Sequence, residues 1–266
     1  MTNYIFKNQR LIDKKQAQVS IQERGLLFGD GIFETCRIVN GKIFNFSAHQ
    51  ARINKGLQNL KFFADVSDLE KKSLKLIAKN KIKNGLLRIL ISRGIGSLGY
   101  LPTYKSEPLT LIETLPARKL PKKIRLGISN QITPVKNLGK TLSALPYVLA
   151  KIEAQEKNLF DCVLLSSKKF IAETASANIF WVKNNKVFTS AKSCGILAGT
   201  ARELILKLSK IKIIETEKKI SALKNADEIF LTNATFLVIS VDEFLGRKLE
   251  KKFATQFLKI LKAQQQ

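Results

Sequence analysis

Residues 171–181 read IAETASANIFW, and this stretch joins an isolated carboxylate to small and then apolar residues. Glu173 lies between an apolar start and the small residues Ala175, Ser176 and Ala177. Residues 179–182 have the aromatic and β-branched character of a strand. Two interpretations of Glu173 follow: a strand-end or capping carboxylate, or the partner of a flat ring that the small residues allow to approach the backbone.

Upstream, a lysine occurs in a short glycine-containing loop, NLGKTLSALPYVLAKIEA, residues 137–154. Lys140 precedes a predicted helix over residues 142–157. Leucines and an isoleucine recur there at helical spacing, and we expect them to pack on a core and so fix the loop: Leu142, Leu145, Leu149 and Ile152. A buried amine is a good nucleophile and base. The alternative is a surface charge, as for most of the 46 Lys and Arg residues.

Downstream, GILAGTAR at residues 195–202 leads into a predicted helix over residues 201–208. Backbone amides of Thr200 and Ala201 at a helix start, with the helix dipole behind them, are suited to bind phosphate. Any glycine before a helix gives a similar pattern, so an ordinary helix start is the alternative. Arg52, on a predicted helix after Ser47, is a candidate for a bidentate phosphate or carboxylate contact. The sole histidine, His49, is expected to be a packing or capping residue.

A glycine-rich segment, SRGIGSLGY at residues 92–100, follows a predicted buried strand over residues 85–92. It lacks the Lys and Ser/Thr of a phosphate loop, and its spacing differs from that of a dinucleotide-binding motif. Arg93 and Tyr100 are candidates for the rim of a substrate site. An ordinary hairpin loop explains the segment equally well.

Strands and helices are mixed along the chain without strict alternation, which predicts an α+β fold. Asn40-Gly41 predicts a hairpin between residues 32–39 and 42–46, and Ser47 is the expected N-cap of the next helix. A second helix is expected over residues 67–81, with Leu69, Leu74, Ile77 and Ala78 facing inward. The segment LPARKLPKK, residues 115–123, is typical of a linker. We therefore expect two domains, residues 1–117 and 118–266, with a ligand site between them.

Composition narrows the class of protein. A net charge of +25 is compatible with nucleic-acid binding, but the basic residues are mostly lysines spread along the chain without interleaved aromatics. We interpret them as a solvated surface that favours a small anionic substrate, not specific nucleic-acid binding. Three scattered cysteines and one histidine give no metal-ligand spacing, and reduced thiols fit the cytoplasm. No apolar run approaches the roughly 20 residues needed to span a membrane.

Taken in order, these motifs resemble the class IV aminotransferase family, the fold-type IV enzymes that depend on pyridoxal 5'-phosphate. The resemblance covers nearly the whole chain: RGLLFGDGIFET (24–35), SAHQARI (47–53), Lys140, ETASANIFW (173–181), GILAGTAR and FLTNATFLVISV (230–241). It implies a small N-terminal α+β domain, a larger C-terminal domain with a pseudo-barrel, and a homodimer.

The resemblance also implies roles for individual residues. Lys140 would bind the cofactor covalently and transfer a proton, and Glu173 would hold the pyridine nitrogen. Arg52, Thr200, Ala201 and the Asn233–Ala234 turn would surround the phosphate. Phe33, Thr35, Arg93 and Tyr100 are the residues we expect at the substrate.

Within the family, ISRGIGSLGY is similar to the ISRGxGxRGY segment of 4-amino-4-deoxychorismate lyases, which form 4-aminobenzoate and pyruvate in folate biosynthesis. SAH, ANIFW and a leucine at 145, where branched-chain transaminases have tyrosine, agree with a lyase. Leu98 departs from the lyase pattern, which has arginine there, and Glu34 is closer to some transaminases. Thr200-Ala201 replaces the Ile-Thr of transaminases. A D-amino-acid or branched-chain aminotransferase is the alternative.

Overall fold

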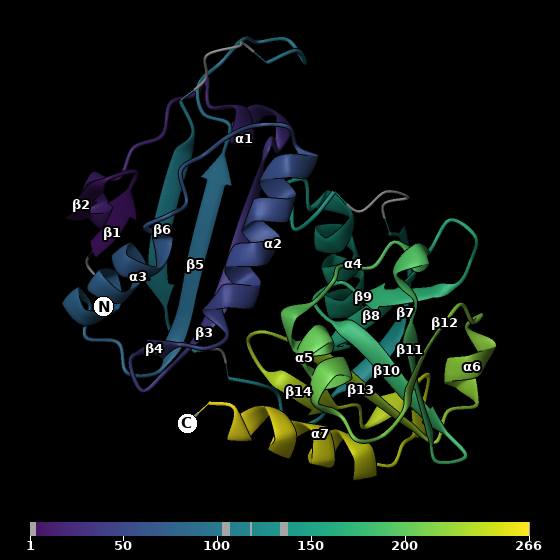
Figure 1. Cartoon of the computed structure of the whole chain (residues 1–266). Coiled ribbons are helices and arrows are strands. Elements are labelled where there is room, and N and C mark those ends of the chain that lie inside the picture. Colours follow the sequence, from purple (N-terminus) through teal and green to yellow (C-terminus); the bar gives the residue numbers. More distant parts are fainter. Residues whose placement is uncertain (1–3, 103–106, 118, 134–137, 266) are drawn as a thin grey trace. The chain divides into compact units, whose positions relative to one another are not determined.

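The computed structural model describes residues 4–102, 107–117, 119–133 and 138–265 (Figure 1). The chain divides into two compact units. The first unit is Met1–Arg118 with Leu138–Ala144, and the second is Lys119–Asn137 with Leu145–Gln266. The segment that carries Lys140 therefore packs with the N-terminal unit, although the sequence placed it after the linker, in the C-terminal domain.

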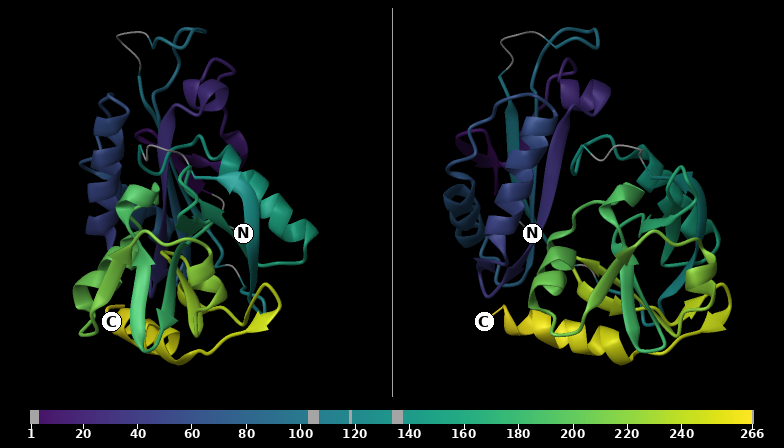
Figure 2. Two further views of the ribbon diagram at one scale, coloured as in Figure 1. Left: turned by 90° about the vertical axis from the view of Figure 1, so that its right-hand side faces the viewer. Right: turned by 45° about the vertical axis from the view of Figure 1, so that its right-hand side comes forward.

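The first unit is a sheet with two helices on one face. The strand order is β2-β1-β6-β5-β3-β4, with antiparallel neighbours. The strands are β1 (Tyr4–Lys7), β2 (Arg10–Asp13), β3 (Gly31–Val39), β4 (Lys42–Ile43), β5 (Gly85–Ser92) and β6 (Leu109–Leu115). The helices are η1 (Lys14–Gln16), α1 (Arg24–Phe28), α2 (Phe46–Asn59) and α3 (Leu69–Lys79). Helices α2 and α3 cover one face of this sheet (Figure 2). Side chains alternate along β3, so Ile32, Cys36 and Ile38 face the core on that side.

The second unit is built on a longer, branched sheet. Its main path is β12-β11-β10-β9-β8-β7-β15-β16, and β13 pairs with both β10 and β14. The strands are β7 (Arg125–Ile132), β8 (Asp161–Leu165), β9 (Ile171–Thr174), β10 (Asn178–Lys183), β11 (Lys186–Ser190), β12 (Ile213–Thr216), β13 (Glu228–Asn233), β14 (Leu237–Ser240), β15 (Glu243–Phe244) and β16 (Arg247–Lys248). The helices are α4 (Leu145–Glu156), η2 (Lys192–Cys194), α5 (Thr200–Leu208), α6 (Ser221–Lys224) and α7 (Lys252–Ala263).

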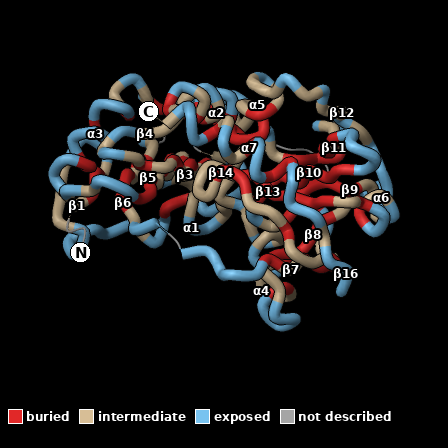
Figure 3. Tube along the Cα trace, turned by 90° about the horizontal axis from the view of Figure 1, so that it is seen from below, coloured by how far each residue is buried: buried red, intermediate tan, exposed pale blue. Residues whose placement is uncertain are grey.

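Each unit has its own buried interior, seen as red tube along the central strands in Figure 3. In the second unit one cluster gathers around Trp181 and Ile229. A stack of aromatic rings ties β10, β13 and α7 together, with centroids 5.0 Å apart for Phe180 and Phe230 and 5.4 Å apart for Phe230 and Phe257. Fully buried strands have continuous apolar runs, which is why the strand at residues 179–182 could be recognised in the sequence.

Two local expectations about the helices of the first unit are wrong. Helix α2 begins at Phe46, not after Ser47, and its N-cap is Asn45 in the left-handed conformation with φ 54°. In α3 the expected inward residues Leu74 and Ala78 are exposed, whereas Lys72 and Ser73 are buried. The long side chain of Lys72 can lie in the interface because its amine pairs with Asp68 at 2.9 Å.

The expected packing of the helix after Lys140 is also wrong. Leu145 is 65% exposed, Leu149 38% and Ile152 46%, while Ala150 and Ala154 are buried. Helix α4 therefore turns its small residues toward β7 and β8, since alanines let a helix approach a sheet closely. Leu145, Leu149 and Ile152 lie on the solvent side and do not fix the Lys140 loop. Leu142, which precedes α4, is half-buried and lies against Gly31, where an added Cβ would be 2.8 Å from its Cδ1.

No helix in the described ranges is long and apolar enough to cross a membrane.

Candidate active site

Backbone hydrogen bonds hold the Lys140 segment against the first unit. The Phe33 amide donates to the Lys140 carbonyl at 2.8 Å, and the Leu142 amide donates to the Gly31 carbonyl at 2.9 Å. Asn59 on α2 adds a side-chain bond to the Leu138 carbonyl at 3.1 Å. The segment thus pairs antiparallel with the start of β3. Backbone pairing with β3 therefore holds the Lys140 loop in place, a role that the sequence had suggested for the apolar residues that follow it.

The amine of Lys140 lies over an aromatic ring. Its Nζ is 4.2 Å from the centroid of the Phe33 ring, a cation–π distance, and the residue is half-buried. Thr35 lies on the same face of β3 as Phe33, two residues along. The structure therefore brings together the predicted covalent lysine and one predicted substrate residue, with a second on the same strand face.

Close packing of two glycines places the lysine loop beside α2. Gly139 has φ +114°, which favours glycine, and a Cβ there would lie 3.4 Å from the Cα of Gly56. Arg52 precedes Gly56 by one helical turn, so both residues are on the same side of α2. Arg52 is thus on the helix face along which the Lys140 loop runs.

Arg52 has an acidic partner that the sequence interpretation missed. Glu34 accepts hydrogen bonds from Arg52 at 2.6 and 2.7 Å, and Nδ1 of His49 is 2.7 Å from the same carboxylate. Burial raises the pKa of Glu34, but the bonds to His49 and Arg52 outweigh it and lower the pKa to about 2. The sequence did contain a signal for this ion pair. Glu34 alternates with Ile32 and Cys36 and so lies on the buried face of β3, where a carboxylate needs a cation.

Glu173 is a buried carboxylate that accepts hydrogen bonds from several elements. It lies in β9 and is 4% exposed. Its Oε2 accepts from Nδ2 of Asn178 at 3.1 Å and from the Leu197 amide at 3.0 Å. Its Oε1 accepts from the Tyr147 hydroxyl at 3.1 Å. The residue is thus a strand residue with a fixed orientation, tied by Leu197 to the GILAGTAR loop.

Helix α5 begins where the sequence predicted an anion site. Thr200 and Ala201 form its first turn, after Gly199, and no side-chain cap is found for it in the described residues. A Cβ at position 199 would lie 1.9 Å from Oδ1 of Asn178, the residue that also holds Glu173. Only glycine at position 199 allows the backbone to come this close to Asn178. The start of α5 and the carboxylate of Glu173 are therefore both positioned by Asn178.

The turn after β13 is organised by the side chain of Asn233. Its Oδ1 accepts from the amides of Thr235 and Phe236 at 2.9 and 3.0 Å, and its Nδ2 donates to the Ser176 carbonyl at 3.0 Å. Asp161 accepts from the Ser176 hydroxyl at 2.6 Å. The Asn233–Ala234 turn and the small residues after Glu173 are therefore neighbours, and Asn233 is chiefly a builder of this turn.

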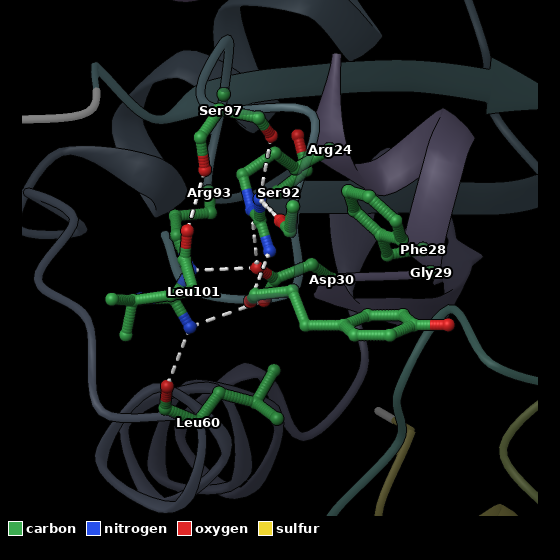
Figure 4. A network of polar contacts seen from close by, with 12 residues as sticks. Arg24, Phe28, Gly29, Asp30, Leu60, Ser92, Arg93, Ser97 and Leu101 are labelled. Atoms are coloured by element: carbon green, nitrogen blue, oxygen red, sulfur yellow. Dashed lines mark hydrogen bonds and ion pairs between the residues drawn. The ribbon is translucent and has the colours of Figure 1, made fainter. Parts of the chain in front are cut away.

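The glycine-rich loop is anchored by a network of arginines and an aspartate (Figure 4). Arg93 donates to both oxygens of Asp30, at 2.7 and 3.1 Å, and to the Leu60 carbonyl at 2.7 Å. Arg24, which the sequence interpretation did not single out, donates to Asp30 and to three carbonyls of the loop, those of Ser97, Gly99 and Tyr100. The guanidinium of Arg93 therefore supports the loop, while the side chain of Tyr100 is 91% exposed.

Pyridoxal 5'-phosphate, which the sequence resemblance implies, fits the residues present. The second unit offers the buried carboxylate of Glu173 for a pyridine nitrogen, with small residues beside it. It also offers the start of α5, where Gly199 lets the backbone pack closely against Asn178. The first unit offers a half-buried amine over an aromatic ring. The chemistry these groups support is reaction at the amino group of a small substrate.

Comparisons with known proteins agree with the assignment to a family that uses pyridoxal 5'-phosphate. A family model described as amino-transferase class IV matches residues 31–244. A putative branched-chain-amino-acid aminotransferase of Methanocaldococcus jannaschii is 31% identical over 97% of this chain and 93% of its own length. A D-alanine aminotransferase of Bacillus licheniformis is 30% identical over 91% of this chain and 88% of its own length.

A solved structure of the same fold is 4-amino-4-deoxychorismate lyase from Pseudomonas aeruginosa. It superimposes with a TM-score of 0.86 at 22% identity, over 97% of this chain and 98% of that one. The predicted α+β, fold-type IV architecture is confirmed by this match together with the family model. The chain therefore belongs to the class IV aminotransferase family, and pyridoxal 5'-phosphate is its cofactor.

Proposed function

We propose that this enzyme is a lyase that converts 4-amino-4-deoxychorismate to 4-aminobenzoate and pyruvate. The observation that carries the proposal is the loop at residues 92–100, which matches the SRGxGxRGY pattern of such lyases except at Leu98. Its Ser92 donates to Glu23 at 2.7 Å, its Arg93 pairs with Asp30, and Arg24 binds its carbonyls. The matching residues thus have contacts that build one particular loop.

In this proposal the chain's own groups hold the cofactor and move one proton. Lys140 binds the cofactor covalently, and Glu173 keeps its pyridine nitrogen protonated. The bound cofactor supplies an electron sink. The amine of Lys140 would also act as the base that takes the proton from the substrate ring carbon that bears the amine. Loss of that proton and departure of the enolpyruvyl group as pyruvate make the ring aromatic, so no co-reactant is consumed.

The phosphate is proposed to bind at the start of α5. Amides of Thr200 and Ala201 and the Asn233–Ala234 turn would contact it, with Arg52 as the cation. Glu34 holds Arg52 by two hydrogen bonds, so the guanidinium has a fixed direction.

Phe33, Thr35 and Tyr100 are the proposed substrate contacts. Arg93 would act through the loop it supports, because its guanidinium is engaged by Asp30 and Leu60. Leu98, 75% exposed, stands where the lyase pattern has an arginine. A substrate carboxylate would then depend on other cations, and the net charge of +25 favours an anionic substrate in general.

An aminotransferase acting on D-amino or branched-chain amino acids is the second candidate. Glu34 favours it, because the lyases have threonine at this position and a threonine cannot bind Arg52 and His49 in the way this carboxylate does. The names of the two relatives that are 30% and 31% identical favour it as well.

The enzyme is also proposed to be a cytoplasmic homodimer. Leu145, Val148, Leu149 and Ile152 form an exposed, uncharged face of α4, spaced as one helix side. Two copies that each carry a net charge of +25 repel one another. An isologous contact through an apolar face avoids placing like charges together, so a second copy is the occupant we propose.

A product assay tests the function. The purified enzyme is incubated separately with aminodeoxychorismate, with D-alanine plus 2-oxoglutarate, and with L-leucine plus 2-oxoglutarate. We expect 4-aminobenzoate from the first mixture without any keto acid. Strict dependence on a keto acid would instead establish a transaminase.

The covalent role of Lys140 is tested alongside. Lys140→Ala should lose the adduct that borohydride traps, together with turnover. Lys157→Ala, at an exposed position just after α4, is the matched control and should keep both. An adduct retained by Lys140→Ala would exclude Lys140 as the attachment residue.

A further inference from the structure

Tyr147 makes a hydrogen bond that no motif predicted. Its hydroxyl donates to Oε1 of Glu173 at 3.1 Å, while Asn178 and Leu197 donate to Oε2. The two oxygens of this carboxylate are therefore held by different elements: Oε2 by β10 and the GILAGTAR loop, and Oε1 by α4. Charge-assisted bonds of this kind are stronger than neutral ones and direct the carboxylate.

The orientation of α4 explains why Tyr147 reaches Glu173. Tyr147, Ala150 and Ala154 recur at helical spacing, and the two alanines are buried. Tyr147 therefore belongs to the sheet-facing side of α4, whereas Leu145 and Val148 are exposed. The helix rotation that contradicts the leucine-stripe expectation is the one that aims this phenol at the carboxylate.

The phenol remains a donor over the working pH range. Burial raises the pKa of Tyr147, and the charge and hydrogen bond of Glu173 raise it further. A neutral donor stabilises the ionised form of a carboxylate relative to the protonated form. The ionised form is the one that keeps a proton on an adjacent pyridine nitrogen.

We infer that Tyr147 is a positioning residue that acts through Glu173: it fixes Oε1 and favours the ionised carboxylate, and so holds the proton on the pyridine nitrogen of the cofactor. The inference rests on the proposed assignment of Glu173 to that nitrogen. It concerns either candidate reaction, because both need the same electron sink.

The test reads the protonation of that nitrogen directly. Tyr147→Phe removes one oxygen and keeps the ring, and the variant is reconstituted with cofactor labelled with ¹⁵N in the pyridine ring. We expect the ¹⁵N resonance at neutral pH to lie nearer the unprotonated position than in the wild type, because more of the proton is on the carboxylate, with cofactor still bound. Turnover should fall about tenfold, the effect of losing one hydrogen bond to a charged group. Tyr4→Phe, in β1 of the first unit, is the matched control and should change neither.

A double-mutant cycle shows whether Tyr147 acts through Glu173. In the Glu173→Gln background the change Tyr147→Phe should have little further effect on the ¹⁵N titration or on turnover. Equal effects in both backgrounds, or a wild-type titration in Tyr147→Phe, would overturn the inference. If Glu173→Gln itself leaves the resonance unchanged, the assignment of Glu173 fails, and the two failures are thus distinguished.

A second variant covers the case in which Tyr147→Phe does not fold. Replacement of Tyr147 by 3-fluorotyrosine keeps nearly the same shape and makes the hydroxyl a stronger donor. The pyridine nitrogen should then be protonated to a greater extent at neutral pH than in the wild type. An unchanged titration would contradict the inference without any loss of structure.

Discussion

Glu34 and Arg52 form a buried ion pair whose members are close in sequence but belong to different elements. The carboxylate faces the core side of β3, and the guanidinium and His49 come from α2. A buried carboxylate is stable only when it is paired and hydrogen-bonded. The proposed phosphate contact of Arg52 therefore depends on an acidic residue that never touches the phosphate in this proposal.

The pH dependence of stability should report this pair. The pKa of Glu34 is lowered from 4.5 to about 2, so its ionised form stabilises the fold above the unfolded pKa, and this contribution is lost as the pH falls toward 2. The shift corresponds to about 3 kcal/mol at neutral pH. We expect the difference in unfolding free energy between wild type and Glu34→Gln, measured in urea, to shrink between pH 5 and pH 3.

Glu113→Gln is the control for this experiment. Glu113 pairs with Lys14 and Arg88 at a more exposed site, with 24% of its side chain accessible. Its effect should be small at every pH. A difference for Glu34→Gln that does not vary with pH would mean that the carboxylate titrates normally.

At the scale of elements, the start of α5 and the strand pair β9–β10 depend on one glycine. Gly199→Ala would put a Cβ 1.9 Å from Oδ1 of Asn178, which must then move away from Glu173 and Leu197. We expect the affinity of the apoenzyme for pyridoxal 5'-phosphate, measured by titration, to fall at least tenfold, because one support serves both the proposed phosphate site and the carboxylate proposed to hold the nitrogen. Gly99→Ala, where a Cβ meets no atom within 4 Å, should bind normally.

The loop at residues 92–101 owes its shape to α1 and the turn that follows it. Arg24 is 2% exposed and donates to the carbonyls of Ser97, Gly99 and Tyr100, while Asp30 joins it to Arg93. Burial raises the pKa of Asp30, but hydrogen bonds from Arg93 and Arg24 outweigh it and lower the pKa. The loop is therefore fixed by the fold and is not merely a flexible glycine-rich segment.

Removal of this anchor should loosen the loop. Arg24→Met keeps an apolar stem but leaves the loop carbonyls and Asp30 without its charge, which costs about 3 kcal/mol or more. We expect faster proteolytic cleavage within residues 94–101, mapped by mass spectrometry, and weaker substrate binding. Arg10→Met, at an exposed position of β2, should leave the cleavage pattern unchanged, and identical cleavage in both variants would refute the anchoring role.

At the scale of the whole molecule, the exposed face of α4 makes a prediction about assembly. Val148 is 50% exposed, so Val148→Asp should not disturb the interior of the second unit. In a two-fold symmetric contact the substitution occurs in both subunits, so two aspartates would lie near one another in an apolar interface and repel. The variant should therefore sediment as a monomer at concentrations where the wild type is a dimer. Gln155→Asp, on an exposed position of the same helix, should remain dimeric. A dimeric Val148→Asp would locate the interface elsewhere.

Sequence patterns predicted most of the strands because each pattern is local. The hairpin at Asn40-Gly41 and the buried strand at residues 85–92 need only neighbouring residues to form. The rotation of a helix about its own axis was harder to predict from the sequence. In α4 the leucines and the alanines both recur at helical spacing, and the sequence offered no means to tell which set meets the sheet.

The sequence by itself determined the chemistry available to this protein: a lysine, an acidic residue and a helix start in the order that the family uses, and the α+β arrangement of strands and helices. The tertiary structure decided which side chains support them. Arg52 with Glu34, Asn178 and Tyr147 with Glu173, and Arg24 with the loop are pairs chosen by packing. The physical reason is that a pattern of residues encodes local geometry and residue type, whereas a buried polar group takes its partner from whatever the folded chain brings within hydrogen-bonding distance.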